Sequence, residues 1–522
     1  MRSGGASARP RLTGRWRGST SRFLAATFWA LGLGGIGGFA CDGAAPGRTT
    51  EPTACDVRGV SALCGELQVP EDRAGAGPTA RLQLGYVVLP AHGARRESPV
   101  FFLAGGPGQS ATQLTRELAP LFEELRQERD IVLLDQRGTG RSGRLHCDTP
   151  DELTEYFRED FDLEALGACR ARLGKNPAHY STAAAADDLD ELRAALGYDT
   201  INLVGASYGT RLALSYAARH PTRARALVLD GVAPPAMRLF LDALPDAQRA
   251  LDLVFERCKR APACAARSPH LAADFKALLA RLAEEPLTRT IPHPATGKSV
   301  ELTLTRAGLA GAIRVLLYSP ELTALVPHLI REVARGELGG LAAAVHAVAR
   351  GTQATVSLGL MLSVACAEDV PRITDAELDE AAARSFVPKS SVLEFRRACE
   401  VWLGASPSAV ATDAGVPSGT LADGALRSIP SENLIISIPA LILSGELDPV
   451  TPPRWGEQAK AGLPRGLHLV VPGAAHGTLS VGCVPRLMTE LIRRGDAQGL
   501  DASCLEGHTP PPLFLDALGP GP

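Results

Sequence analysis

An alternation of short apolar runs with helical patterns is the feature that most restricts the fold of this chain. This pattern is typical of βαβ units, whose strands lie parallel in one sheet with helices against its faces. It extends over residues 55–235, stops over residues 236–430 and returns over residues 431–508. We therefore predict an α/β fold in which a mostly parallel central sheet is interrupted by a large insertion.

The insertion, residues 236–430, has mostly helical patterns, and we interpret it as a cap. An independent second domain is the alternative, but the two late strands alone would make a poor separate core. Residues 41–54 are expected to be a flexible tether, and residues 509–522 a loosely held tail. The expected strands are Leu82–Leu89, Pro99–Leu103, Asp130–Leu134, Thr200–Val204, Ala226–Leu229, Ala440–Leu443 and Leu467–Val471.

Residues 1–40 have the composition of a secretory signal. Six arginines precede an uncharged run, Phe23–Ala40, which ends in small residues just before Cys41. A cationic start, an apolar stretch and small residues are typical of an export signal. A permanent membrane anchor is the alternative, although five glycines in the run disfavour it. Cys41 is a candidate for lipid attachment, so we expect a periplasmic, membrane-anchored or extracellular protein.

The eleven cysteines support an exported protein. Without Cys41, ten remain, an even number that can form five bridges in an oxidising compartment. Because they lie as neighbours along the chain, we predict sequential pairing, although spacing cannot prove it. The predicted bridges are Cys55–Cys64, Cys147–Cys169, Cys258–Cys264, Cys366–Cys399 and Cys483–Cys504.

Charge and motif composition exclude several classes of partner. A net charge of -3 gives no electrostatic footprint for nucleic acid. No C-x-x-C motif is present, and no histidine lies at metal-ligand spacing from a cysteine pair, so we expect no bound metal. The sequence does not fix the oligomeric state.

The segment Gly205–Gly209 matches G-x-S-x-G and joins an expected strand to an expected helix. On such a turn the backbone of the serine is strained and its hydroxyl is presented above the sheet. So short a motif indicates a nucleophile only in this strand–turn–helix context. We therefore predict that Ser207 is a nucleophile.

A serine hydroxyl needs a neighbouring base, and in this arrangement the acid and the histidine follow the serine in the chain. Asp448 follows the strand Ala440–Leu443, and His476 follows the strand Leu467–Val471. Both loops leave the same edge of the sheet as the serine turn, so we predict a triad of Ser207, His476 and Asp448. The rival positions are Asp230, Glu446, His220 and His468.

Stabilising the oxyanion of an acyl-transfer reaction requires two backbone donors. The first is predicted to be the N–H of Tyr208, directly after the nucleophile. The second is expected in the glycine-rich turn Gly105–Gly108, which follows an apolar strand, with Gly106 the favoured donor.

These motifs together resemble the prolyl aminopeptidase and tripeptidyl aminopeptidase family of serine peptidases. The similarity rests on GGPG at residues 105–108, DQRGTGRS at residues 135–142, GASYG at residues 205–209 and GELDPVTP at residues 445–452. It implies an α/β-hydrolase core, a helical cap, no cofactor and removal of short units from peptide N-termini. Ala104 departs from the prolyl aminopeptidases, which carry histidine there. Asp135 and Arg137 are expected to brace a turn rather than to act in catalysis.

An exopeptidase of this kind must bind a free α-ammonium group, for which a carboxylate is the natural partner. We nominate Glu368, with Asp369 second, although a solvated acidic loop is the alternative interpretation. The predicted function is an exported serine exopeptidase acting on small peptides through an acyl-enzyme. Two other functions remain open: a carboxylic ester hydrolase with the same triad, and a non-catalytic envelope binding protein.

Overall fold

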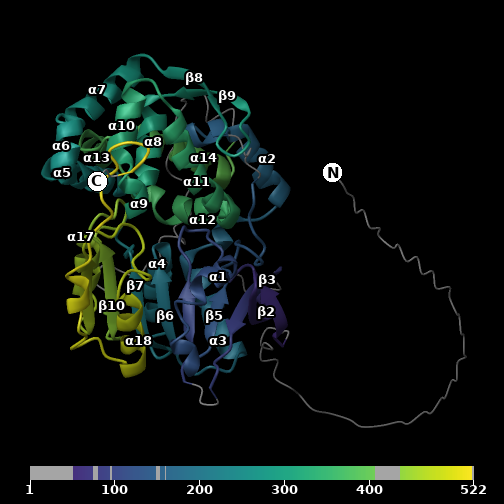
Figure 1. Cartoon of the computed structure of the whole chain (residues 1–522). Helices are drawn as coiled ribbons and strands as arrows, with labels where there is room; N and C mark the ends of the chain where they lie inside the picture. The colour runs from purple at the N-terminus through teal and green to yellow at the C-terminus, as the bar shows by residue number, and fades with distance from the viewer. Residues whose placement is uncertain are drawn as a thin grey trace, which may run out of the picture. The chain divides into compact units, whose positions relative to one another are not determined.

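The structure is a computed structural model that describes residues 51–73, 80–93, 97–147, 153–158, 160–405 and 435–519. In this part of the chain, nine strands form one sheet in the order β1-β2-β3-β5-β4-β6-β7-β10-β11 (Figure 1). The six strands from β5 to β11 in this order are parallel, and β1, β2 and β3 form an antiparallel edge. Their bounds are β1 Thr53–Val57, β2 Val60–Pro70, β3 Arg81–Leu89, β4 Val100–Leu103, β5 Ile131–Leu134, β6 Ile201–Ala206, β7 Ala224–Asp230, β10 Ala440–Gly445 and β11 Gly466–Val471.

The central strands are apolar throughout because both faces of the sheet are covered. Successive side chains alternate between two buried clusters: Leu203 lies in one, with residues of α3 and α4, and Val204 lies in the other, with residues of α18. This alternation follows from the two-residue period of a strand. The helices of this core are α1 Thr115–Leu118, α2 Leu163–Leu173, α3 Thr182–Ala195, α4 Tyr208–Arg219, α17 Pro453–Ala461 and α18 Val484–Arg494.

The insertion is gathered at one end of the sheet, drawn in teal and green in Figure 1. Most of its buried side chains form a cluster of their own. It also contains a two-stranded antiparallel sheet, which the helical prediction for residues 236–430 missed. Its elements are α5 Ala243–Arg260, α6 Pro262–Arg267, α7 Leu271–Glu284, β8 Leu287–Pro292, β9 Ser299–Leu304, α8 Arg306–Leu316, α9 Pro320–Thr323, α10 Val326–Ala334, α11 Gly339–Thr355, α12 Leu358–Glu368, α13 Asp375–Ala383 and α14 Ser390–Leu403.

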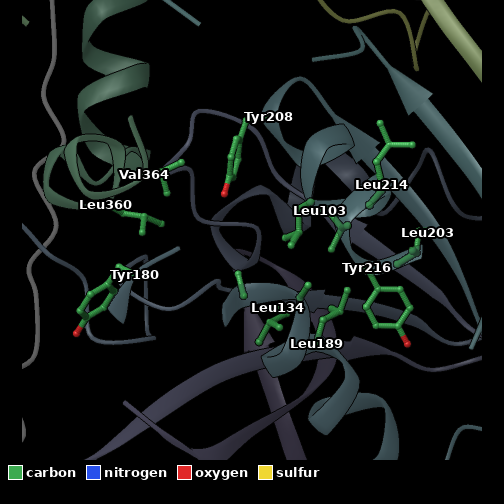
Figure 2. Packing of buried hydrophobic residues seen from close by; sticks show 14 of the residues in the cluster. Leu103, Leu134, Tyr180, Leu189, Leu203, Tyr208, Leu214, Tyr216, Leu360 and Val364 are labelled. Carbon is green, nitrogen blue, oxygen red and sulfur yellow. The ribbon is translucent and has the colours of Figure 1, made fainter. Parts of the chain in front are cut away.

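Two helices of the insertion contribute buried side chains to the core cluster. Leu360 and Val364 of α12 are buried in the same cluster as Tyr208 of α4, and Figure 2 shows these side chains together. Trp402 of α14 belongs to this cluster as well. Because these side chains complete the core, the insertion and the sheet share buried apolar surface.

Two of the expected boundaries are wrong. The tether was expected to extend to residue 54, but β1 begins at Thr53 and pairs with β2. The tail from residue 509 is packed in its described part, up to residue 519. Leu513 is buried in the insertion's cluster, and the N–H of Phe514 donates to the carbonyl of Ala324. Proline and glycine content suggested a loose segment, but a few buried side chains hold it in place.

The five disulfides have the predicted pairing, Cys55–Cys64, Cys147–Cys169, Cys258–Cys264, Cys366–Cys399 and Cys483–Cys504. Among the helices that the structure describes, none is both long and apolar enough to cross a membrane. The expected signal over residues 1–40 and the expected lipid site at Cys41 lie outside the described residues.

Candidate active site

The turn between β6 and α4 holds Ser207 in a strained conformation. Its φ of 54° and ψ of -124° are rare for a residue with a side chain. Such strain is typical of functional positions that the surrounding structure enforces. Gly209 makes the turn possible, because a Cβ there would lie 2.0 Å from the carbonyl oxygen of Leu103. The sequence motif therefore has the backbone geometry of a nucleophile elbow.

His476 and Asp448 are joined directly. The Nδ1 atom of His476 lies 2.9 Å from a carboxylate oxygen of Asp448, which is fully buried. The same carboxylate accepts the N–H groups of Val450 and Thr451, both at 2.8 Å, and the hydroxyl of Thr451 at 2.9 Å. These four contacts fix the orientation of the carboxylate and so of the imidazole.

The electrostatics of this pair suit a base that becomes positively charged. Burial by itself lowers the pKa of His476, but the charge and hydrogen bond of Asp448 outweigh it, so the net pKa is raised above 6.5. Burial likewise opposes ionisation of Asp448, but the neighbouring imidazole and the backbone donors keep its pKa below 3.8. A proton received by His476 is therefore stabilised by a fixed carboxylate.

The end of β7 lies between Ser207 and His476. The N–H of Ser207 donates to the carbonyl of Asp230 at 2.8 Å. At the next residue, Gly231, a Cβ would lie 3.3 Å from Cε1 of His476. The structure thus brings the two predicted residues to either side of one turn. No hydrogen bond joins their side chains among the described contacts, which is common for catalytic pairs without substrate.

The rival residues have other partners. The carboxylate of Asp230 accepts hydrogen bonds from the backbone N–H groups of Thr478 and Leu479. Glu446 accepts the N–H of Gly473. His220 lies against Asp187 at the end of α4, and His468 lies between Ser444 and Glu457.

The glycine-rich turn after β4 lies beside the elbow. A Cβ at Gly105 would come within 3.0 Å of Cβ of Ser207. Gly106 has a φ of 107°, and a Cβ there would lie 2.7 Å from the nitrogen of Gly108, so this position requires glycine. The side-chain amide of Gln136 donates to the carbonyl of Ala104 at 3.2 Å and holds the start of the turn. The turn therefore lies against the nucleophile at Gly105, and the predicted donor Gly106 is the next residue.

The second predicted donor, Tyr208, is the first residue of α4. Its N–H belongs to the first turn of a helix, where backbone donors have no partner within the helix. The phenol is buried and its hydroxyl lies 2.7 Å from the hydroxyl of Thr182, which anchors the elbow helix to the start of α3.

The DQRGTGRS segment braces the turns around the site, as expected. The carboxylate of Asp135 accepts hydrogen bonds from the hydroxyls of Ser110 and Thr112, which follow the glycine-rich turn. Arg137 is fully buried and forms a two-point ion pair with Asp188 of α3.

The insertion is connected to both sides of this site. The N–H of Ser357 donates to the carbonyl of Gly108 at 2.8 Å, on the side of the glycine-rich turn. On the other side, the N–H of His476 donates to the carbonyl of Tyr318 at 3.1 Å, and the two rings lie 5.2 Å apart. Nothing in the sequence marks Tyr318 as a site residue. Thr451 was not selected either, although it lies three residues after the predicted acid.

The structure contradicts a substrate-binding role for Glu368 and Asp369, because both carboxylates are fully buried with partners of their own. Glu368, at the end of α12, accepts the N–H of Thr182 at 2.8 Å and its hydroxyl at 2.7 Å. Asp369 forms ion pairs at 3.0 Å with Arg211 and with Arg372. Burial also raises the pKa of Glu368 and so favours its neutral form, which is a poor partner for an ammonium group. Both residues connect the insertion to the core.

Comparison with known proteins agrees with this geometry. Residues 98–304 match the family model for the alpha/beta hydrolase fold, and residues 422–504 match the model described as TAP-like protein. The chain has the α/β-hydrolase fold. This fold and its peptidase relatives make it a serine hydrolase. Among the described residues, no group of three or more His, Cys, Asp or Glu side chains is arranged to hold a metal ion.

The relatives of this serine hydrolase include two named peptidases. It is 28% identical over 474 residues to Serine protease Hip1 of Mycobacterium tuberculosis, covering 85% of this chain and 87% of that protein. It is 29% identical over 191 residues to Tripeptidyl aminopeptidase of Streptomyces lividans, covering 33% of this chain and 36% of that protein. A proline iminopeptidase structure from Mycobacterium smegmatis aligns over 83% of this chain and 98% of that chain, with 16% identity and a TM-score of 0.34.

Proposed function

We propose that this serine hydrolase is a peptidase that works through an acyl-enzyme, with Ser207 as nucleophile and His476 as base. The hydroxyl oxygen of Ser207 attacks the scissile carbonyl carbon while His476 takes its proton. The N–H groups of Gly106 and Tyr208 stabilise the oxyanion. His476 then returns the proton to the leaving amine, and water releases the acyl group by the reverse sequence. The observation that carries this proposal is the His476–Asp448 contact beside the strained Ser207.

Exopeptidase action on short peptides is the form of this activity that we favour. The names of the relatives support it, since they include a tripeptidyl aminopeptidase. The insertion supports it as well, because it contacts both the glycine-rich turn and the His476 loop. An insertion held at both sides of the site leaves room for the end of a peptide more readily than for the middle of a folded protein.

A fluorophosphonate probe tests the nucleophile. The wild-type protein is expected to be labelled, and Ser207→Ala is expected not to be. Ser215→Ala is a matched control, because Ser215 is buried in α4 two turns further on. Equal labelling of the wild type and Ser207→Ala would refute the assignment of the nucleophile.

Cleavage of peptides with free and acetylated N-termini tests the exopeptidase function. Free peptides are expected to be cleaved, with release of short N-terminal units, and acetylated ones to resist cleavage. The alternative, ester hydrolysis by the same triad, is favoured by one observation: the two carboxylates nominated for the ammonium group already have partners. Rapid cleavage of simple esters together with indifference to acetylation would support that alternative.

We also propose that the protein is exported, as a periplasmic, lipid-anchored or extracellular enzyme. The five disulfides support this location, since such bonds persist in oxidising compartments. Cell fractionation of the wild type and Cys41→Ala tests the anchor, because loss of the thiol should move a lipid-anchored protein from the membrane to the soluble fraction.

A further inference from the structure

Within the residues that the structure describes, Arg314 has no acidic partner and contacts a tyrosine that lies against the imidazole of the site. Arg314 is in the last turn of α8, and its guanidinium contacts Tyr318, at 3.4 Å from the phenol oxygen and 6.0 Å from the ring centroid. Tyr318 is the residue whose ring and carbonyl contact His476. The contacts thus run from Arg314 through Tyr318 to the imidazole.

Some arginines that reach into the interior are paired with carboxylates, and others, such as Arg129 and Arg331, donate only to carbonyl or hydroxyl oxygens. Arg314 differs from both groups because it donates to Tyr318, the residue that contacts His476. Arg211 is paired with Asp369, Arg137 with Asp188, and Arg454 with Asp246. Within the described parts of the chain, the only hydrogen bond of the Arg314 side chain is the one to Tyr318. Arg314 is only half-buried, so its guanidinium remains within reach of a ligand carboxylate. A guanidinium left available at a reaction centre is suited to bind a carboxylate with two parallel hydrogen bonds.

The sheet order places Arg314 on the leaving-group side of the site. The glycine-rich turn follows β4, on one side of β6, and the His476 loop follows β11, on the other side. The oxyanion donors therefore lie on the β4 side, while His476, which protonates the leaving group, lies with Tyr318 and Arg314 on the opposite side. The Tyr318 ring centroid lies 6.0 Å from the guanidinium of Arg314 and 5.2 Å from the His476 ring centroid. An extended chain spans about 3.3–3.6 Å per residue, so a leaving group of up to about three residues would cover this distance.

We propose that Arg314 binds a carboxylate at the end of the leaving group, so that the enzyme favours substrates whose departing part is short and ends in a free carboxyl group. This inference rests on the proposed roles of Ser207 and His476, and it adds a substrate preference to them. Arg314 is a specificity residue in this scheme, since it contacts the substrate away from the reacting atoms. Its charge also acts on the site, because Arg314 opposes the rise in the pKa of His476 that Asp448 and Asp230 produce.

The test compares matched substrates in the full-length protein and its variants. One pair is tetra-alanine with a free C-terminal carboxylate or a C-terminal amide. The other pair is 4-acetoxybenzoate and 4-acetoxybenzamide, esters whose leaving groups differ in the same charge. The ratio of kcat/KM for the acid to kcat/KM for the amide is measured within each pair. Because each ratio is compared between variants, intrinsic differences in leaving-group reactivity cancel.

The wild type is expected to prefer the acid, and Arg314→Gln to lower the acid-to-amide ratio about tenfold, the effect of losing a hydrogen bond between charged groups. Arg314→Lys should retain part of the preference. Arg306→Gln, at the start of the same helix, should keep the wild-type ratio. An unchanged ratio in Arg314→Gln would overturn the proposal. If the wild type cleaves the esters but neither peptide, the peptidase function fails, while the ester pair still decides the role of Arg314.

Discussion

The carboxylate of Asp230 accepts hydrogen bonds from the backbone N–H and the hydroxyl of Thr478, two residues beyond His476. The backbone carbonyl of the same Asp230 accepts the N–H of Ser207. One residue at the end of β7 therefore holds both the nucleophile and the loop that carries the base. Its negative charge also contributes to the raised pKa of His476.

Asp230→Asn is expected to lower kcat/KM about 10- to 100-fold, because an amide cannot accept the Thr478 and Leu479 donors on both of its heavy atoms. A buried group left unsatisfied costs about 1–3 kcal/mol, and 1.36 kcal/mol is tenfold in rate. The acidic limb of the pH profile should also move to lower pH, since a negative charge near His476 is lost. A variant with reduced activity but an unmoved acidic limb would show that Asp230 acts through structure alone.

The pH dependence of the wild type follows from the raised pKa of His476. The base must be neutral to accept a proton, so kcat/KM is expected to rise with pH and to reach half its maximum above pH 6.5. Asp448→Asn should move this midpoint to lower pH and reduce kcat by about 10⁴-fold, because the amide no longer fixes the imidazole tautomer. Glu457→Gln, which alters the exposed partner of His468, is the matched control. A wild-type midpoint well below pH 6.5 would contradict the prediction.

The positions of the three candidate loops were predictable because their signals are local. Each of Ser207, Asp448 and His476 comes a few residues after a short apolar run, and parallel strands bring such loops to one edge of the sheet. The disulfide pairs were predictable for a similar reason, since each joins neighbouring cysteines. Local signals could not predict the contacts that the insertion makes with the site. Nothing in the sequence around Tyr318 indicates that it contacts His476.

The error at Glu368 has a specific physical cause. The helix α12, Leu358–Glu368, is apolar on all sides and so has no amphipathic period that would mark it as a helix. Its last residue was therefore not predicted to end a buried helix, and its carboxylate was nominated to bind the substrate. A helix that is buried all round places its terminal carboxylate inside the protein, where Glu368 accepts the donors of Thr182 at the start of α3.

Asp369→Ala is expected to lower the free energy of unfolding by about 3–5 kcal/mol, because it leaves the buried Arg211 without its counter-charge. Asp379→Ala removes an exposed pair with Lys389 and should cost less than about 1 kcal/mol. Denaturant unfolding measures both values. If Asp369→Ala instead raised KM for free peptides while leaving stability unchanged, the substrate-binding role rejected above would be restored.

The disulfide Cys366–Cys399 joins α12 to α14 across a sequence separation of 33, whereas Cys258–Cys264 closes a separation of 6. Cross-links stabilise more when they close longer loops, so replacing the first pair by alanines should lower the free energy of unfolding by about 4 kcal/mol, and replacing the second by about 2 kcal/mol. Urea unfolding of the two double variants measures the difference.

The two disulfide variants should also differ at the active site. Cys366 and Cys399 lie in the cluster that buries Tyr208 of the elbow helix, whereas Cys258 and Cys264 lie in the insertion's own cluster. Loss of Cys366–Cys399 is therefore expected to slow fluorophosphonate labelling of Ser207 under conditions where both variants are folded, and loss of Cys258–Cys264 is not. Equal labelling rates would mean that the shared cluster supports the fold without influencing the elbow. A slower rate in the first variant alone would show that α12 and α14 help to hold the nucleophile in its strained conformation.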